Sequence, residues 1–428
     1  MKILLQTIFL LITSVCMGCS DSNEVTATKP AAQIEQFTIQ CGGTYYRGNI
    51  NEETKVIRIS GITSRKVITG VKYQLSGGAS ISPNPLEVKR WENEQKFTVT
   101  GSDNQTEVYT VLLPDLQYEP DVVPRVVIGY LPAGDGDFDS QFDNLHWESL
   151  THVNVSFAHV KSDGSLNTSK VTDAKLRQIR TKAQEYDVKV LISINKNSTG
   201  EFTAAIKNET SRNALAANII AFTKGNQLDG FDIDYEEYDN WNANFPSLLA
   251  FIKTLHENKE ESMLMTCAVV SRWLNYTTEW QNYFDYINLM SYDKGCYTET
   301  PVQHSSYEDF VADLNYWVNT CKVPKSKIVG GLPFYGYSWD EGINKDEVRA
   351  VRFNGVLKFF GDTYGLEAVA DADNISKTYY NGRPTIRKKC QYIMDNDFGG
   401  VMIWQLFQDA YQEELKLINV VGEVIVIR

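Results

Sequence analysis

Three carboxylic acids stand at alternate positions in the segment Phe231–Glu236, which reads FDIDYE. In an extended strand successive side chains point to opposite faces, so Asp232, Asp234 and Glu236 share one face. Carboxyl groups this close repel one another and cannot all stay ionised without a large energetic cost, so one proton is held in the row. Such a row can perform general acid catalysis, and Glu236, the outermost acid, is best placed to donate the proton.

Two other interpretations compete for this acidic segment. An Asp-x-Asp-x-Glu pattern can begin a calcium loop, but an EF-hand needs glycine at the sixth place, where this chain has Glu237. A solvated edge strand is the second alternative. The residues between the acids are Phe231, Ile233 and Tyr235, and these favour a buried strand. The catalytic interpretation is therefore preferred.

The elements that must position the acids repeat along residues 125–428, where strand-like runs alternate with amphipathic helical patterns. The expected strands are Val126–Tyr130, Thr151–Ala158, Lys189–Ile194, Leu228–Asp234, Met263–Ser271, Tyr286–Tyr292, Lys327–Tyr335 and Gly399–Gln405. The clearest helices are Thr172–Glu185, Ser211–Lys224, Phe245–Asn258 and Tyr307–Cys321. Eight such units predict an α/β fold, a (β/α)8 TIM barrel, whose site lies at the carboxyl ends of the strands. A doubly wound open sheet is the alternative, but no glycine-rich phosphate loop follows the first strand.

The segment Asp229–Glu236 resembles the DGxDxDxE signature of glycoside hydrolase family 18, which contains chitinases and endo-β-N-acetylglucosaminidases. Four other segments resemble the second, sixth, seventh and eighth strands of that family, in the right order: Thr151–Ala158, Asn288–Asp293, Gly331–Gly336 and Gly399–Trp404. The resemblance covers residues 125–418. It implies an enzyme without cofactor or metal that cleaves β-1,4-linked N-acetylglucosamine glycans, such as chitin or chitooligosaccharides.

The resemblance also implies a role for each acid. Glu236 would protonate the glycosidic oxygen, and the 2-acetamido oxygen of the substrate would attack the anomeric carbon, so the reaction would be retaining and substrate-assisted. Asp234 would hold the acetamido N–H and stabilise the oxazolinium ion. Asp232 would share a proton with Asp234 and set its charge.

Five further residues line the expected pocket by the same resemblance. Tyr292 would hydrogen-bond the acetamido carbonyl, with Met290 and Asp293 in the same pocket. Trp404 would form the floor on which the sugar stacks, and Tyr130 would line the wall near the first acid of the row.

The chain departs from the family pattern at three places. The third strand ends in Ser193–Lys196 (SINK) where the family often has Ser-x-Gly-Gly, and Tyr235 replaces the commoner tryptophan. The span 338–398 is short for the α+β insertion that deepens the groove of some family members, so we expect a shallower, more open cleft.

Two other functions stay open at this stage. An endo-β-N-acetylglucosaminidase that splits the chitobiose core of N-glycans would use the same acids, so the motif does not separate it from a chitinase. A non-catalytic glycan-binding protein of the same family is the third possibility. Such members typically lose the acid, whereas this chain retains Glu236, Asp234 and Tyr292.

Residues 33–114 carry short β-patterned runs and predict an all-β, Ig-like sandwich. The expected strands are Ile34–Gln40, Lys55–Ser60, Val67–Leu75, Glu87–Trp91, Lys96–Thr100 and Glu107–Leu113, the last two joined at the turn Gly101–Asn104. This part resembles modules that precede catalytic domains in secreted bacterial glycosidases, and a spacer role is expected. A proline-containing linker, residues 115–124, follows it.

The first residues are typical of an export signal, because Lys2 precedes the apolar stretch Ile3–Met17. Cys16–Cys19 (CMGC) resembles a bacterial lipobox, so residues 1–18 are expected to be a lipoprotein signal peptide and Cys19 the lipidated residue. Residues 19–32 then read as a flexible tether. The protein is expected to be exported and lipid-anchored to a bacterial cell-envelope membrane, at the outer membrane or cell surface. An ordinary signal peptide is the alternative.

Composition limits the partners. The net charge of −13 argues against nucleic acid and polyanions, whereas 23 Tyr and 8 Trp suit a neutral sugar ligand. The five cysteines after the lipobox and the five histidines are widely scattered and indicate neither a zinc site nor a disulfide framework. We expect a monomer with free thiols.

Overall fold

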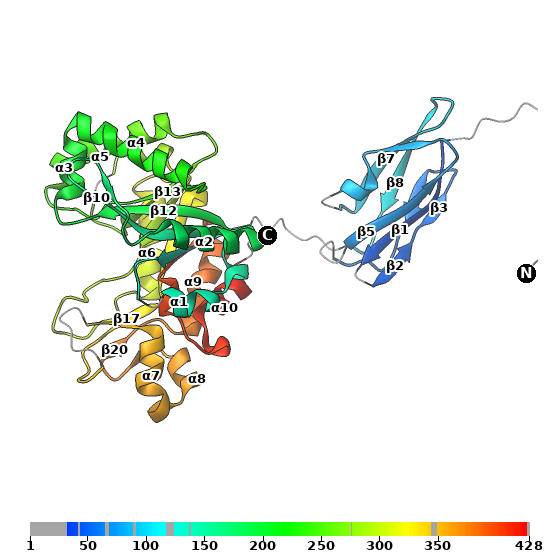
Figure 1. Cartoon of the computed structure of the whole chain (residues 1–428). Helices are drawn as coiled ribbons and strands as arrows, with labels where there is room; N and C mark the ends of the chain where they lie inside the picture. Colours follow the sequence, from blue (N-terminus) through cyan, green and yellow to red (C-terminus); the bar gives the residue numbers. More distant parts are fainter. Residues whose placement is uncertain are drawn as a thin grey trace, which may run out of the picture. The chain divides into compact units, whose positions relative to one another are not determined.

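The computed structural model describes residues 32–425 apart from positions 42, 65–67, 89–90, 117–123, 137, 275 and 344–348. The predicted signal peptide, Cys19 and all but the last residue of the tether lie outside the described residues, as does most of the predicted linker. The chain divides between residues 121 and 122 into two compact units, both drawn in Figure 1. None of the described helices is both long and apolar enough to cross a bilayer.

The first unit is a β-sandwich, as predicted. One sheet has the order β2-β1-β5 and the other the order β3-β4-β8-β7-β6. The strands are β1 (Ile34–Cys41), β2 (Thr44–Arg47), β3 (Asn49–Asn51), β4 (Val56–Arg58), β5 (Ile68–Leu75), β6 (Ser80–Ser82), β7 (Glu94–Thr100) and β8 (Thr106–Leu112). Phe37 and Ile39 from the first sheet share a core with Phe97 and Tyr109 from the second, which makes the two sheets one folding unit.

The strand predicted at Glu87–Trp91 is wrong at the residues of this range that the structure describes, Glu87, Val88 and Trp91. Residues Pro85–Glu87 form a 3-10 helix, because Asn84 accepts a hydrogen bond from the Leu86 N–H and the proline suits the first helical position. Trp91 still packs in the sandwich core, but it does so outside any strand of the described residues.

The second unit is an eight-stranded parallel barrel, which confirms the predicted fold class. Its strands are β9 (Val126–Pro132), β10 (His152–Val160), β12 (Lys189–Lys196), β13 (Gly230–Asp234), β14 (Leu264–Val270), β15 (Tyr286–Met290), β16 (Ile328–Pro333) and β21 (Gly400–Trp404). They follow one another in chain order, and β21 and β10 both pair with β9, which closes the ring. The short strand β11 (Leu166–Asn167) adds to β10 outside the ring.

Helices follow the strands around the barrel (Figure 1). They are α1 (Phe138–Gln141), α2 (Asp173–Glu185), α3 (Glu201–Lys207), α4 (Glu209–Gly225), α5 (Trp241–Asn258), α6 (Tyr307–Asn319), α9 (Arg383–Asp395) and α10 (Leu417–Val424). Thr172, Asn208 and Ser306 accept hydrogen bonds from the first turns of α2, α4 and α6, which explains where three of the four predicted helices begin.

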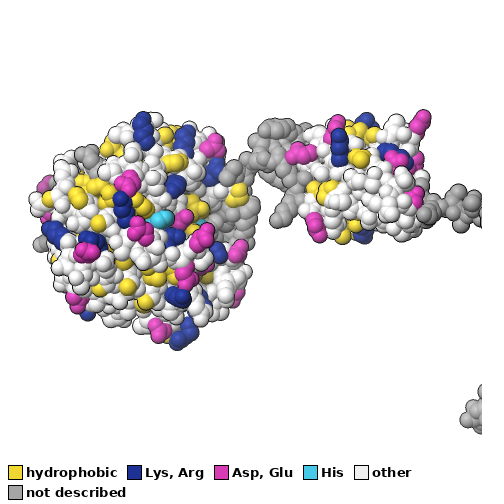
Figure 2. All heavy atoms as spheres, turned by 90° about the horizontal axis from the view of Figure 1, so that it is seen from above, with side chains coloured by type: hydrophobic (Ala, Val, Ile, Leu, Met, Phe, Trp, Pro, Cys, Tyr) yellow, Lys and Arg dark blue, Asp and Glu magenta, His cyan; other side chains and the backbone are white. Residues whose placement is uncertain are grey.

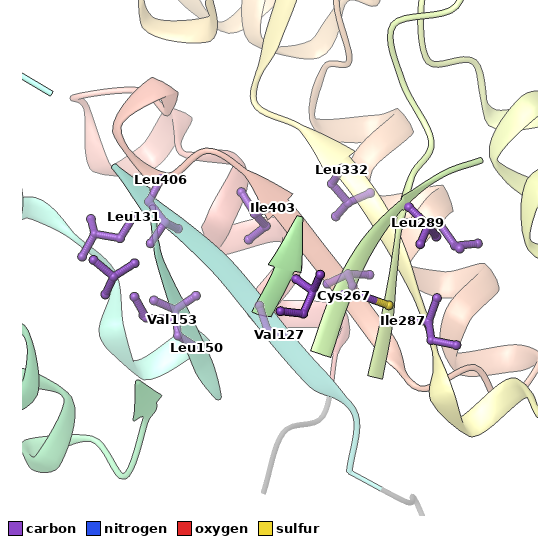
Figure 3. Packing of buried hydrophobic residues seen from close by; sticks show 14 of the residues in the cluster. Val127, Leu131, Leu150, Val153, Cys267, Ile287, Leu289, Leu332, Ile403 and Leu406 are labelled. Carbon is purple, nitrogen blue, oxygen red and sulfur yellow. The ribbon is translucent and has the colours of Figure 1, made fainter. Parts of the chain in front are cut away.

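Strand alternation separates the two faces of the barrel wall. Val127 and Leu131 of β9 point outward and pack with Leu150, Val153, Ile403 and Leu406 in the cluster that Figure 3 shows. Ile128 and Tyr130 point inward and belong to a second, smaller cluster. The same alternation sends Phe231 and Ile233 of β13 outward and leaves the aspartates of that strand inside.

An α+β insertion lies between β16 and α9, so the prediction that the span 338–398 lacks one is wrong. Four antiparallel strands form its sheet, in the order β18-β17-β20-β19, with two helices, α7 and α8, that Figure 1 shows beside β17 and β20. The ranges are β17 (Tyr335–Ser338), β18 (Ala350–Arg352), α7 (Phe353–Tyr364), α8 (Leu366–Asp371), β19 (Asn374–Ile375) and β20 (Thr378–Tyr379). Strands of two to four residues give no periodic signal in a sequence, so the insertion was not predicted. The expectation of a shallower cleft depended on the absence of this insertion and is no longer supported.

Candidate active site

The acidic row lies at the carboxyl end of β13, as the alternation predicts. Asp232 and Asp234 are buried inside the barrel, and the half-buried Glu236 stands two residues beyond the end of the strand. Tyr235, between the last two acids, packs outward against Phe202 of α3. The predicted division of the segment into an acidic face and an apolar face is therefore observed.

Asp232 is held by hydrogen bonds from four neighbours. The hydroxyls of Tyr130 and Ser193 each donate to its Oδ2 at 2.7 Å, and the Thr266 hydroxyl donates to its Oδ1 at 2.6 Å. The Asn288 amide donates a longer bond of 3.4 Å to Oδ1. Burial raises the pKa of Asp232, and these bonds oppose that rise because they favour the carboxylate. Every one of the four donors comes from a barrel strand, so the barrel itself fixes this acid.

Asp234 carries the more perturbed carboxyl of the two aspartates. Burial raises its pKa well above the usual range, and the charges of Glu236 and Asp232 raise it further. A hydrogen bond from the Asn195 amide, 2.8 Å from Oδ2, opposes these effects, and its buried Oδ1 has no hydrogen-bond partner among the described residues. Burial and the neighbouring charges therefore favour the protonated form of Asp234.

Asn195 and Lys196, at the end of β12, are site residues that the sequence did not identify. The Asn195 amide also approaches Glu236 Oε1 at 3.2 Å, and the Lys196 ammonium donates to the main-chain oxygen of Glu236 at 2.8 Å. These are the positions at which the chain departs from the Ser-x-Gly-Gly pattern. The departure itself was the available signal, because it placed two polar side chains beside the acids.

A cavity of about 140 Å³ opens above the acids. Its lining contains seven of the eight predicted barrel-site residues and two others: Tyr130, Asp234, Glu236, Met290, Tyr292, Asp293 and Trp404, with Ala268 and Tyr335. Asp232, the eighth, lies beneath the cavity and is joined to its wall by the hydrogen bond from Tyr130. The structure thus brings all the predicted barrel-site residues together.

Tyr292 presents a phenol that is ready to donate a hydrogen bond. Burial raises its pKa well above the usual value, and the charges of Asp293, Asp234 and Glu236 raise it further, so the hydroxyl keeps its proton. Within the protein it makes a long contact of 3.9 Å to the Met402 sulfur. Gly331 on β16 makes room for the ring, because a Cβ there would lie 3.0 Å from it and 2.3 Å from the Leu289 carbonyl oxygen.

Asp293 is tied to the insertion. The hydroxyls of Tyr335 and Tyr337 on β17 both donate to its Oδ1, the second at 2.9 Å, and its main-chain N–H lies 3.3 Å from Nδ1 of the buried His304. Sequence reasoning gave none of these three residues a role. Their contacts show that the insertion supports one wall of the pocket.

Trp404 at the end of β21 forms an aromatic floor. The Phe157 ring stacks on it at 5.8 Å with an interplanar angle of 22°, and Tyr130 packs at 5.5 Å with a tilt of 58°. The two rings limit how far the indole can turn. A planar indole held in this way offers a face for an apolar sugar surface.

A larger cavity, of about 680 Å³, lies among α8, α9 and α10. Three of the four cations that line it form ion pairs: Arg383 with Asp371, Arg387 with Glu423 and Lys416 with Glu413. Perturbed carboxyls and a convergent aromatic floor mark catalytic sites better than size does, so the smaller pocket is the candidate.

Within the described part of the chain, His, Cys, Asp and Glu side chains form no group of three or more that could hold a metal ion. Cys41, Cys267, Cys296, Cys321 and Cys390 are free thiols. On the face shown in Figure 2, Lys and Arg are scattered among Asp and Glu, unlike the continuous basic patch typical of nucleic-acid binding.

Comparison with known proteins places the barrel in a family. Residues 126–409 match the glycosyl hydrolases family 18, and residues 1–123 match a domain of unknown function, DUF4971. A crystal structure of a chitinase from Bacteroides thetaiotaomicron is 58% identical, covers 72% of this chain and 98% of that chain, and gives a TM-score of 0.69.

Two more distant proteins are also similar to this chain. The crystal structure of a family 18 chitinase from the chitin utilization locus of Flavobacterium johnsoniae is 30% identical, covers 71% of this chain and 94% of that chain, and gives a TM-score of 0.59. Probable chitinase 10 of Drosophila melanogaster is 23% identical over 53% of this chain, and the match spans 12% of that protein. With the acidic row, the barrel and the family match in agreement, this chain belongs to glycosyl hydrolase family 18 and is a glycoside hydrolase.

Proposed function

We propose that this protein cleaves β-1,4-linked N-acetylglucosamine glycans, chitin or chitooligosaccharides, by a retaining, substrate-assisted reaction. The observation that carries the proposal is the meeting of Glu236, Asp234 and Tyr292 around one pocket above Trp404. The similarity of this chain to two solved structures that are named as chitinases supports the substrate class. The net charge of −13, which disfavours polyanionic ligands, is consistent with a neutral polysaccharide as the substrate.

In the first step one proton is transferred, and the glycosidic bond to the anomeric carbon is replaced by a bond to the acetamido oxygen. Glu236 gives its proton to the glycosidic oxygen while the bond from that oxygen to the anomeric carbon breaks. The acetamido oxygen of the same sugar forms a bond to the anomeric carbon from the opposite face, which gives an oxazolinium ion. Water then attacks that carbon, returns a proton to Glu236 and restores the acetamido group, so two inversions retain the configuration.

The buried aspartates supply the charge that the intermediate needs. Burial raises the pKa of both, which favours a proton shared within the row. Transfer of that proton from Asp234 to Asp232 leaves Asp234 anionic beside the acetamido N–H, where it balances the oxazolinium charge. Tyr292 orients the acetamido oxygen by donating its phenol proton, and Met290 and Asp293 close the same side of the pocket.

Product analysis tests the proposal. The purified protein is incubated with chitooligosaccharides and, separately, with a high-mannose glycoprotein. We expect short N-acetylglucosamine oligomers from the first substrate and from Glu236→Gln a rate lower by about 100-fold to 10,000-fold. Release of N-glycans without chitooligosaccharide cleavage would instead establish an endo-β-N-acetylglucosaminidase. Binding without any product would establish a non-catalytic glycan-binding protein.

The place of action is a separate proposal, and it rests on the sequence. Cys19 becomes the lipidated first residue after removal of residues 1–18, and the lipid holds a monomer at the cell envelope, on the outer membrane or cell surface. The lipobox-like CMGC and the polar residues that follow it support this. A substrate as large as chitin cannot enter a cell, which makes an exported position useful.

A further inference from the structure

Glu236 lies where the sheet no longer holds the chain. Strand β13 ends at Asp234, and its pairing with β12 and β14 ends at Ile233 and Asp234. The proposed acid is therefore outside the ladder of main-chain hydrogen bonds that fixes the other two acids of the row. General acid catalysis demands a fixed place for the proton donor, so other contacts must supply it.

The next residue, Glu237, makes two such contacts. Its carboxylate is buried, and its Oε1 and Oε2 accept hydrogen bonds from the main-chain N–H groups of Gly200 and Thr203 at 2.6 and 2.7 Å. Gly200 precedes α3 with φ of 87° and has no side chain to bond the first turn of that helix. Glu237 takes over this role from a distant part of the sequence, because its two oxygens accept hydrogen bonds from both main-chain N–H groups.

The residue on the other side of Glu236 is attached to the same helix. The hydroxyl of Tyr235 lies 2.6 Å from Oγ1 of Thr203, so both neighbours of Glu236 bind one residue of α3. The Lys196 ammonium holds the main-chain oxygen of Glu236 itself at 2.8 Å. Four hydrogen bonds thus fix the main chain around the acid, while alternation directs its side chain into the pocket.

We propose that Glu237 is a positioning residue for the general acid. It anchors the main chain at Glu236 to α3 and so sets the distance between the Glu236 carboxyl and the glycosidic oxygen. The inference rests on the proposed function, because it assigns Glu237 its role through Glu236. Two consecutive glutamates then do different work: one faces the substrate and the other faces the helix.

Leaving-group chemistry separates this role from a merely structural one. A sugar leaving group needs a proton from a well-placed acid, whereas 2,4-dinitrophenolate leaves without one. A misplaced acid therefore slows oligosaccharide hydrolysis and spares the activated aryl glycoside. A general loss of folded protein slows both reactions to the same degree.

The experiment compares variants on both substrates. For Glu237→Gln, which keeps one oxygen acceptor and turns the other into a donor, we expect kcat on chitooligosaccharides to fall by about 10- to 100-fold with KM changed by less than about threefold. On the 2,4-dinitrophenyl β-glycoside of an N-acetylglucosamine oligomer, kcat should change by less than about threefold. Thr203→Val, which removes the contact to Tyr235 but keeps the main-chain N–H, should show the same selectivity to a smaller degree. If Glu237→Gln does not fold, the Thr203→Val variant provides the test instead.

Two further variants make the outcome decisive. Asp285→Asn is the matched control, because Asp285 also binds a main-chain N–H, that of Met265 at 2.8 Å, but at the other end of the strands. It should leave both rates unchanged. Glu236→Gln should show the same selectivity more strongly, and equal losses on both substrates in that variant would defeat the proposed function. Selectivity in Glu236→Gln with equal losses in both Glu237→Gln and Thr203→Val would overturn only the inference about Glu237.

Discussion

The side-chain amide of Asn195 lies 2.8 Å from Asp234 Oδ2 and 3.2 Å from Glu236 Oε1, so one nitrogen serves both carboxyls. The bond to Asp234 lowers the pKa of that carboxyl against the effects of burial and neighbouring charge. Asn195 therefore limits how firmly Asp234 holds its proton. It also joins the end of β12 to the acidic row on β13.

Asn195→Ala should move the pH dependence of catalysis. Loss of the donor raises the pKa of Asp234 further, so the limb of the kcat profile that reports Asp234 should shift to higher pH. We expect kcat at neutral pH to fall by about tenfold, because a protonated Asp234 does not balance the oxazolinium charge. Initial rates on chitooligosaccharides from pH 4 to 9 measure both effects.

Asn197→Ala is the control for this prediction. Asn197 stands two residues after Asn195 in the chain. Its exposed side chain forms hydrogen bonds with Asn167 and Glu201 and does not contact the three acids. The profile of this variant should match the wild type. An Asn195→Ala profile with unchanged limbs would show that the amide does not set the charge of the row.

The barrel and the position of the acids follow from local patterns. Phe231, Ile233 and Tyr235 alternate with the acids, and alternation in a strand assigns each side chain to a face whatever lies around it. The outward residues of β9 and β21 show the same period. The helices were located by their amphipathic pattern, which is also a local signal. The caps at Thr172, Asn208 and Ser306 act locally as well.

Other parts of the site depend on contacts between distant segments. Asn195 meets Asp234 only because β12 and β13 pair in one register, and Glu237 caps a helix that starts 36 residues earlier, at Glu201. The insertion was not predicted from the sequence because its strands are very short. Residues such as Tyr335 and Tyr337 then reach Asp293 from an element that the sequence did not reveal.

Lys389 should make stability depend on pH. This side chain is fully buried and donates to the Ser305 main-chain oxygen and hydroxyl and to Asn381 Oδ1 at 2.7 to 2.9 Å. Burial lowers its pKa to about 7. Between pH 7 and the ordinary lysine range, the unfolded chain binds a proton that the folded chain does not. Its contribution to stability is therefore lost as the pH falls toward 7 and grows as the pH rises.

Lys389→Met tests that sign. The free energy of unfolding of the wild type, relative to this variant, should rise between pH 7 and 10 by up to about 1.4 kcal/mol per pH unit. Urea unfolding at several pH values measures it. The exposed neighbour gives a matched variant, Lys388→Met, whose curve should stay parallel to that of the wild type. A parallel curve for Lys389→Met as well would mean that Lys389 titrates normally.

Cys19→Ala should release the protein from membranes. Without the thiol no lipid can be attached at this position, and the polar tether after it has no affinity for a bilayer. Fractionation of the expressing bacterium should move the protein from the membrane pellet to the soluble fraction. Cys41→Ala should leave it in the pellet. Retention of Cys19→Ala in the membrane would refute lipidation at that residue.

The configuration of the first product tests substrate assistance most directly. If the acetamido oxygen of the substrate attacks the anomeric carbon, the product released first must be the β-anomer, because two inversions at one carbon restore its configuration. Proton NMR of a chitooligosaccharide reaction, recorded within minutes of adding the enzyme, distinguishes the anomers before they interconvert. The account predicts an initial β-anomer. An initial α-anomer would mean that water attacks directly, and it would contradict the roles proposed for Asp234 and Tyr292.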